Sequence, residues 1–246
     1  MPKFCLEIEY HGSQFCGWQA QKKLDFPSIQ ETIEGVLAKI LGHKVNLVAA
    51  SRTDAGVHAL GQVAHFKTHK AISCDKLKNS LNALLPSTIA VRRVRKVKED
   101  FHSRFQARSK VYRYTILNRK ERSVFLRDTS YHFPYPLNLK LMQKEAKAVV
   151  GTHDFKAFCG VTRKDNNYIR QVKRLKISKI NDLFFFDIEA DGFLNHMVRR
   201  IVGVLLEVGR GRLKPDSLKQ ILRSRDRRKA AFCVPARGLC LLKVKY

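Results

Sequence analysis

The stretch from residue 45 to residue 66, VNLVAASRTDAGVHALGQVAHF, places a short polar segment between two apolar runs. The runs Val45–Ala50 and Gln62–Phe66 are predicted to be β strands. The Asp-Ala-Gly sequence at 54–56 is typical of a sharp turn, because Asp is common in turns and Gly56 tolerates positive φ. The sequence therefore sets one carboxylate, Asp54, in a turn between two strands.

The segments on either side of this stretch predict a split βαβ arrangement. Ser28 and Glu31 form a capping box, which predicts that a helix begins after Ser28, and Gly42 is typical of a helix end. The predicted elements are strand Phe4–Tyr10, the helix from Ser28 to Gly42, the two strands above, helix Cys74–Leu85 closed by Pro86, and strand Ile89–Val97. This order, βαββαβ, is the ferredoxin-like pattern.

The second half of the chain echoes this order loosely. We expect strands Lys110–Leu117 and Ser130–Phe133, helix Leu139–Val150, a hairpin of strands Arg170–Ile180 and Leu183–Ala190, helices Phe193–Val208 and Asp216–Arg223, and strand Leu239–Tyr246. The predicted fold class is α/β (α+β), with two ferredoxin-like βαββαβ-type halves whose antiparallel sheets flank a basic cleft. The basic segment Asp100–Ser109 suggests a boundary between residues 1–104 and residues 105–246. Ligand sites commonly form in such a cleft.

The charge of the chain points to a polyanionic partner. Its 246 residues include 48 Lys and Arg against 21 Asp and Glu, a net charge of +27. Nucleic acid is the expected partner and an anionic membrane is the rival. The basic residues are spread over most of the chain, which favours a broad surface for a folded RNA. No apolar run approaches the roughly 18 residues of a membrane span, and the first residues lack the apolar core of a signal peptide, so we expect a cytoplasmic protein.

The sequence offers no pattern for a metal or a nucleotide cofactor, and we expect neither. The six cysteines and nine histidines lack zinc-ligand spacing, and we interpret the cysteines as reduced thiols. Neither of the common Gly-rich phosphate-binding motifs occurs. Paired acids at a two-metal spacing are not evident, which argues against a metal-dependent nuclease.

Asp54 is the first candidate for chemistry. Locally it is typical of a structural turn residue. However, a lone acid weakens binding to a polyanion, and Arg52, Thr53 and His58 surround it in sequence. A carboxylate among cations stays ionised near neutral pH, which suits a nucleophile or a base.

Two further segments carry candidate side chains. In the strand at 110–117, Tyr112 and Tyr114 share one face and Arg113 the other, so the tyrosines either pack in the core or stack on an unpaired base. In the apolar helix at 193–208, Arg199 and Arg200 interrupt the pattern. Such an arginine either reaches solvent or enters a site and pairs with an acid, for which Asp54 is an obvious candidate.

Long ordered motifs over nearly the whole chain resemble those of the TruA family of tRNA pseudouridine synthases. The motifs are Tyr10-His11-Gly12-Ser13, Gly17-Trp18-Gln19, Ser28-Ile29-Gln30, Arg52–Ala59 with Gly61-Gln62-Val63 and His65-Phe66, Phe101–Phe105, Lys110–Tyr114, Phe193–Arg199 and Ala236-Arg237-Gly238-Leu239. His11, Ser51 and Arg200 depart from residues common in that family.

The resemblance implies an isomerase (an intramolecular transferase) that converts uridine to pseudouridine at positions 38, 39 and 40, in the anticodon stem-loop of tRNA, without cofactor or metal. It implies that Asp54 is the catalytic nucleophile and that Arg199 forms an ion pair with it. It further implies that Tyr112 contacts the target base and that Arg52 helps to extrude or hold the flipped nucleotide. A homodimer that binds tRNA across both subunits is also implied.

Two other classes of function stay open on the residues alone. One is a non-catalytic basic RNA-binding protein, and the other is a metal-dependent nucleic-acid hydrolase. The residues also leave the chemistry of Asp54 open between attack on the ribose, attack on the uracil and removal of a ribose proton to give a glycal.

Overall fold

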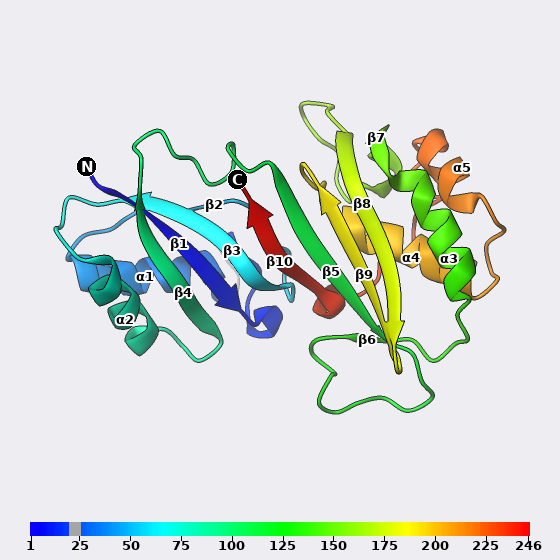
Figure 1. Ribbon diagram of the computed structural model, residues 1–246, viewed down its shortest axis with the longest axis horizontal. Helices are drawn as coiled ribbons and strands as arrows, with labels where there is room; N and C mark the ends of the chain where they lie inside the picture. Colours follow the sequence, from blue (N-terminus) through cyan, green and yellow to red (C-terminus); the bar gives the residue numbers. More distant parts are fainter. Residues whose placement is uncertain (20–25) are drawn as a thin grey trace. The chain divides into compact units, whose positions relative to one another are not determined.

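The computed structural model describes residues 1–19 and 26–246, which form two compact units (Figure 1). The first unit contains residues 1–108 and 240–246, and the second contains residues 109–239. These units differ from the expected halves, 1–104 and 105–246, mainly at the end of the chain, because the last strand belongs to the unit that also holds the first strand. Among the helices described, none has the length and apolar character needed to cross a membrane.

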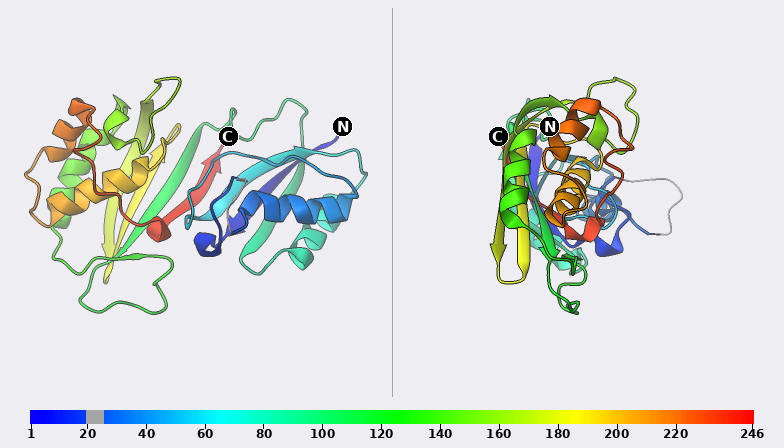
Figure 2. Two further views of the ribbon diagram at one scale, coloured as in Figure 1. Left: turned by 180° about the vertical axis from the view of Figure 1, so that it is seen from behind. Right: turned by 90° about the vertical axis from the view of Figure 1, so that its right-hand side faces the viewer.

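The first unit is a mainly antiparallel sheet with helices on one face (Figures 1 and 2). Its elements are β1 Lys3–Tyr10, the 3-10 turn η1 Gly12–Gln14, α1 Ile29–Leu41, β2 Val48–Ala49, β3 His58–Lys67, α2 Cys74–Leu84, β4 Ile89–Val97 and β10 Leu239–Lys245. The strand order is β4-β1-β3, and both β2 and β10 pair with β3 on the edge that β1 leaves open. β2 pairs antiparallel at His65 and β10 pairs parallel at His58, so the two short pairings occupy opposite ends of that edge.

The local signals in the first unit act as predicted, with one difference at β2. Ser28 caps α1 through a complete capping box with Glu31, and Gly42 ends the helix with a φ of 81°. The strand predicted at 45–50 is confirmed only at Val48–Ala49. The backbone N–H of Leu47 donates to the Glu34 carboxylate at 2.8 Å instead of to a neighbouring strand. A side chain from α1 thus shortens the strand.

The second unit is also a sheet with helices on one face (Figure 2). Its elements are β5 Ser109–Leu117, β6 Tyr131–His132, α3 Leu139–Ala146, η2 Lys147–Val149, β7 Gly151–Asp154, η3 Lys156–Phe158, β8 Ile169–Ile180, β9 Leu183–Ala190, α4 Met197–Gly209, α5 Ser217–Ser224 and η4 Ala236–Gly238. The strand order is β5-β9-β8-β7, all antiparallel, with β6 parallel beside β5. The α/β prediction is confirmed, and β7 is an additional strand that the sequence pattern did not indicate.

The helix predicted from Phe193 begins four residues later, at Met197, because its N-terminus is fixed by a distant loop. His196 adopts a left-handed conformation, with a φ of 60°. The backbone N–H of Gly160 donates to the carbonyl of Asn195 at 2.8 Å. A Cβ at Gly160 would lie 2.3 Å from the Asn195 side-chain oxygen and 2.6 Å from His196 Nδ1, so only glycine permits this approach.

A short segment after β4 packs against His65 on the first unit's sheet. The backbone N–H of Ser103 donates to His65 Nδ1 at 3.2 Å, and the Ser103 hydroxyl donates to the carbonyl of Val48 at 2.7 Å. His65 is 6% exposed. Burial lowers the pKa of His65 to about 4, and the positive charges of Lys3 and Lys67 and the neighbouring His102 act in the same direction.

This histidine predicts a loss of stability in mild acid. Below pH 6.5 the unfolded chain takes up a proton at His65, whereas the folded protein resists protonation down to about pH 4. The free energy of unfolding therefore decreases as the pH is lowered through that window. The variant His65→Asn keeps an acceptor for Ser103 but cannot be protonated. We expect urea unfolding between about pH 7 and 5 to show a shallower decline for His65→Asn than for the wild type. Equal slopes would contradict this assignment, whatever the variant's own stability at pH 7.

Candidate active site

The turn that carries Asp54 has the predicted geometry. The backbone N–H of Val57 donates to the carbonyl of Asp54 at 3.2 Å, and Gly56 has a φ of 78°. Along the turn, Thr53 and Val57 are buried, Asp54 is half-buried and Arg52 is exposed. The turn is therefore anchored on both sides of Asp54 while the Arg52 side chain faces solvent.

A buried polar network holds the first side of the turn. The hydroxyls of Tyr10 and Thr53 lie 2.8 Å apart, and both residues are buried. The side chain of Gln62, on β3, is fully buried, and its amide nitrogen donates to the carbonyl of Ser51 at 2.7 Å. Its amide oxygen accepts from the backbone N–H of Ser51 at 3.3 Å. A fully bonded network in a low-dielectric interior gives the turn a single arrangement.

The backbone of residues 12–18 forms the wall behind Asp54. The N–H of Trp18 donates to the carbonyl of Thr53 at 3.0 Å. Gly17 has a φ of 106°, and a Cβ there would lie 2.7 Å from the Thr53 oxygen. A Cβ at Gly12 would lie 2.0 Å from the Val57 oxygen. Both glycines are required because two backbones meet where no side chain fits.

His58 acts as a structural brace in this arrangement. Its Nδ1 accepts a hydrogen bond from the backbone N–H of Gly12 at 3.0 Å, and the side chain is 6% exposed. The rings of His58 and His11 lie 4.4 Å apart. His58 thus ties the start of β3 to the wall behind Asp54.

On β5 of the second unit, the alternation predicted for Tyr112, Arg113 and Tyr114 is confirmed. Tyr112 is 5% exposed, and its ring meets that of Phe193 edge-on at 5.1 Å. Arg113 points to the opposite face and holds the Asp187 carboxylate through two bonds of 2.7 and 2.8 Å. Tyr112 therefore lies on the face of the sheet that the helices cover.

Tyr114 is a packing residue of this face. Its hydroxyl donates to the carbonyl of Pro235 at 2.7 Å, and a Cβ at Gly238 would lie 2.6 Å from its ring. Burial raises the pKa of Tyr114, and the positive charge of Arg199 opposes this shift. The side chains of Tyr114 and Arg199 are therefore close enough to interact electrostatically.

The two arginines of α4 both find partners within the second unit. Arg199 Nε donates to the carbonyl of Val234 at 2.8 Å. Arg200 Nη1 donates to the carbonyls of Ala230 and Arg227 at 2.9 and 3.2 Å. Both side chains are half-buried, so neither simply extends into solvent. The ion pair between Arg199 and Asp54 would join the two units, and it stays a prediction.

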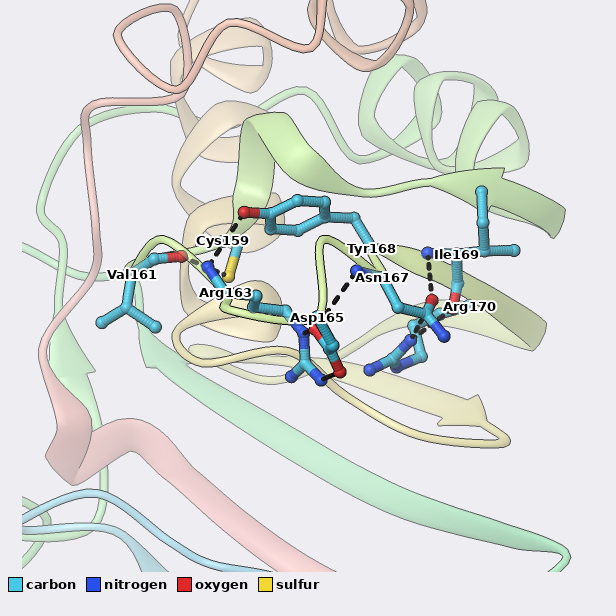
Figure 3. A network of polar contacts seen from close by, with 8 residues as sticks. All are labelled: Cys159, Val161, Arg163, Asp165, Asn167, Tyr168, Ile169 and Arg170. Carbon is cyan, nitrogen blue, oxygen red and sulfur yellow. Dashed lines mark hydrogen bonds and ion pairs between the residues drawn. The ribbon is translucent and has the colours of Figure 1, made fainter.

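The loop at 159–168 precedes β8, and Figure 3 shows its polar contacts. In it, the Tyr168 hydroxyl accepts from the backbone N–H of Arg163 at 3.0 Å, and the Asp165 carboxylate binds the Arg163 guanidinium. The hydrogen bond from Arg163 lowers the pKa of Asp165. Arg227 donates to the carbonyl of Gly160 at 3.0 Å. The loop thus has internal contacts and a tie to the segment that follows α5.

Sequence reasoning missed the residues that clamp the Asp54 turn. In the sequence, Tyr10 marks the end of one predicted strand and Gln62 the start of another, and Gly12 and Gly17 stand out only as parts of motifs that carry the resemblance. A polar Gln inside an otherwise apolar strand is a detectable signal, because buried amides require partners. The two glycines give no comparable signal, because their partners lie about 40 residues away.

Within residues 1–19 and 26–246, no three His, Cys, Asp or Glu side chains are placed to ligate one ion. The cysteines at 5, 16, 74, 159, 233 and 240 are all free thiols.

Comparisons with known proteins point to one family. A family model described as tRNA pseudouridine synthase matches residues 7–106 and 146–246. A protein named tRNA pseudouridine synthase A from Thermoanaerobacter sp. (strain X514) is 44% identical over 246 residues, which is 100% of both chains. Proteins of the same name from Moorella thermoacetica and Clostridium acetobutylicum are each 42% identical, over 100% and 98% of both chains respectively.

A solved chain titled as part of a Cbf5-Nop10-Gar1 complex has a TM-score of 0.30 and 15% identity, covering 83% of this chain and 54% of that one. This likeness is too low to support an inference. The family model and the full-length relatives carry the assignment: the chain belongs to the tRNA pseudouridine synthase family.

Proposed function

We propose that the protein isomerises uridine to pseudouridine in the anticodon stem-loop of tRNA and that Asp54 is its nucleophile. The observation that carries this proposal is the fixed geometry of the Asp54 turn. Buried hydrogen bonds and two close glycine contacts hold the turn, which bears a half-buried carboxylate. Membership of the tRNA pseudouridine synthase family supports the reaction class. The resemblance of the chain's motifs to those of the TruA family supports the anticodon arm, with uridines 38, 39 and 40, as the target.

The reaction breaks the bond between the ribose and a uracil nitrogen and forms a bond from the same ribose carbon to uracil C5. C5 loses its proton, and the released nitrogen takes up a proton. No atoms are gained or lost, so the isomerisation needs no co-reactant. An ionised Asp54 serves as the nucleophile on ribose or uracil, or takes a ribose proton to give a glycal. All three routes use the same carboxylate.

The target nucleotide must leave the helical stack before Asp54 reaches it. The exposed Arg52 is suited to hold neighbouring phosphates or to fill the space that the nucleotide leaves. Tyr112 supplies an aromatic side chain for contact with the flipped base. Arg199 is proposed to pair with Asp54 and keep it ionised. We also propose a cytoplasmic homodimer that binds tRNA across both subunits, as the resemblance implies.

Replacing the proposed nucleophile should abolish the chemistry but keep RNA binding. For Asp54→Asn we expect tritium release from tRNA labelled at uracil C5 to fall by about 10³-fold or more. The matched control is Asp100→Asn, which removes an exposed carboxylate of the same unit. Wild-type release by Asp54→Asn would rule out Asp54 as the nucleophile.

The same incubation separates the rival functions. A non-catalytic RNA-binding protein would bind tRNA with a steep salt dependence and leave it unmodified. A metal-dependent hydrolase would cut the strand, and EDTA would abolish the cutting. Mapping pseudouridine and strand breaks after incubation with and without EDTA therefore distinguishes all three.

The wall behind Asp54 should matter for catalysis beyond its effect on stability. Gly17→Ala brings a Cβ to 2.7 Å from the Thr53 oxygen, whereas Gly42→Ala meets nothing within 4 Å, although both glycines have positive φ. We expect both variants to lose about 1 kcal/mol or more of unfolding free energy. Only Gly17→Ala should also lose isomerase activity, by about tenfold or more, measured below both melting temperatures. Equal specific activities would show that the wall does not position Asp54.

Arg199 should act through its charge. In Arg199→Leu the single-turnover rate should fall about 10²-fold, because Asp54 loses the cation proposed to pair with its carboxylate and hold it in position. Arg199→Lys also loses the Nε bond to Val234 but keeps the charge, so it should recover much of the rate. If the Lys and Leu variants were equally slow, the charge of Arg199 would not be what matters and its bond to Val234 would explain the effect.

A further inference from the structure

A cavity lies in the second unit, at the β7 edge of its sheet, with a volume of about 840 Å³. It is lined by residues of α3, η2, β7 and α5, which are grouped at this edge in Figure 1. We name it the β7 cavity. The strand order is β5-β9-β8-β7, so Tyr112 on β5 lies three strands away, about 14 Å at the usual spacing. The β7 cavity is therefore separate from Tyr112, the residue of this sheet proposed to contact the target base.

Basic side chains dominate the lining of the β7 cavity. They are Lys144, Lys147, Lys219, Arg223 and Arg225, and all five are exposed. Arg225 forms an ion pair with Asp154 at 2.9 Å. The other four form no ion pair with any carboxylate in the described part of the chain. Their charges are therefore available to a ligand.

Two of the three acids at the β7 cavity are already bonded to protein donors. Glu145 is 4% exposed, and its carboxylate accepts from the backbone N–H groups of Asp216 and Leu218 at 2.6 and 3.2 Å. Asp154 accepts from the backbone N–H of Lys156 at 2.9 Å besides its pair with Arg225. These carboxylates serve the fold, so the charge that the cavity presents outward is positive.

The spacing of the other four basic residues is electrostatically unfavourable when no ligand is bound. Lys219 and Arg223 stand four residues apart on α5, and Lys144 and Lys147 stand three apart at the end of α3. Like charges at these spacings lie on one helix face and repel each other. A polyanion in the cavity would relieve the repulsion within both pairs at once.

We propose that the β7 cavity binds backbone phosphates of the tRNA at a distance from the nucleotide that reacts. The identity of the polyanion rests on the proposed function. Exposed ammonium and guanidinium groups are suited to contact phosphates. Such contacts fix the position of an RNA but carry no sequence information. The cavity thereby sets the register in which the RNA reaches the active site.

The test uses Lys219→Gln with Arg223→Gln in the full chain and measures binding of an unmodified tRNA transcript over a range of salt concentrations. Both positions are exposed, and circular dichroism checks the fold. We expect the affinity near 0.15 M salt to fall about tenfold or more, and the log–log salt slope to become shallower by about 1.8, that is about 0.9 for each lost phosphate contact. Ethylated phosphates that interfere with wild-type binding but not with binding of the variant identify the contacts.

The matched control is Lys76→Gln with Lys78→Gln on α2, which removes the same charge from the first unit. A wild-type affinity and slope in the cavity variant would overturn the proposal, and so would an equal loss in both pairs, because general charge would then explain the effect. A loss of binding to anionic vesicles with unchanged tRNA affinity would assign the cavity to a lipid surface and overturn it too. Binding does not depend on turnover, so absence of isomerase activity would refute the proposed function and leave this result standing.

Discussion

The geometry of the Asp54 turn depends on a contact between two stretches of backbone. Gly12 and Gly17 bring the segment at 12–18 so close to the turn that an added Cβ would overlap the carbonyl oxygens of Val57 and Thr53. A carboxylate on a short side chain takes its direction from the backbone that bears it, so this contact positions Asp54. The buried bonds from Tyr10 to Thr53 and from Gln62 to Ser51 then remove the remaining freedom of the turn.

The turn also explains how one acid fits a chain of net charge +27. Several acids elsewhere serve the fold through visible contacts. Glu31 completes the cap of α1, Asp187 holds Arg113, and Glu145 accepts from the backbone at the start of α5. A half-buried acid on a tightly fixed turn is costly for RNA affinity, and its proposed role in the reaction accounts for that cost. The cationic surface then provides the binding that this acid opposes.

Local rules predicted the elements whose determinants lie within a few residues. The capping box at Ser28 and the strand Ile89–Val97 are found as expected, because helix caps and strand alternation depend only on residues a few positions apart. The predictions differ from the structure where a distant group intervenes. Glu34 takes the N–H of Leu47 and shortens β2, and Gly160 binds Asn195 and delays the start of α4. Neither contact leaves a trace in local periodicity.

The sequence by itself determined the strand–turn–strand segment with Asp54 at its tip, the shared face of Tyr112 and Tyr114, and the positive charge that an RNA partner requires. These features depend on residue type and on neighbours a few positions away. Only the tertiary structure decided that Gly12, Gly17 and Gln62 clamp the turn, and that β10 returns to pair with β3. Those contacts join residues from 11 to 182 positions apart, and their energies depend on close packing and buried hydrogen bonds that form only when the chain is folded.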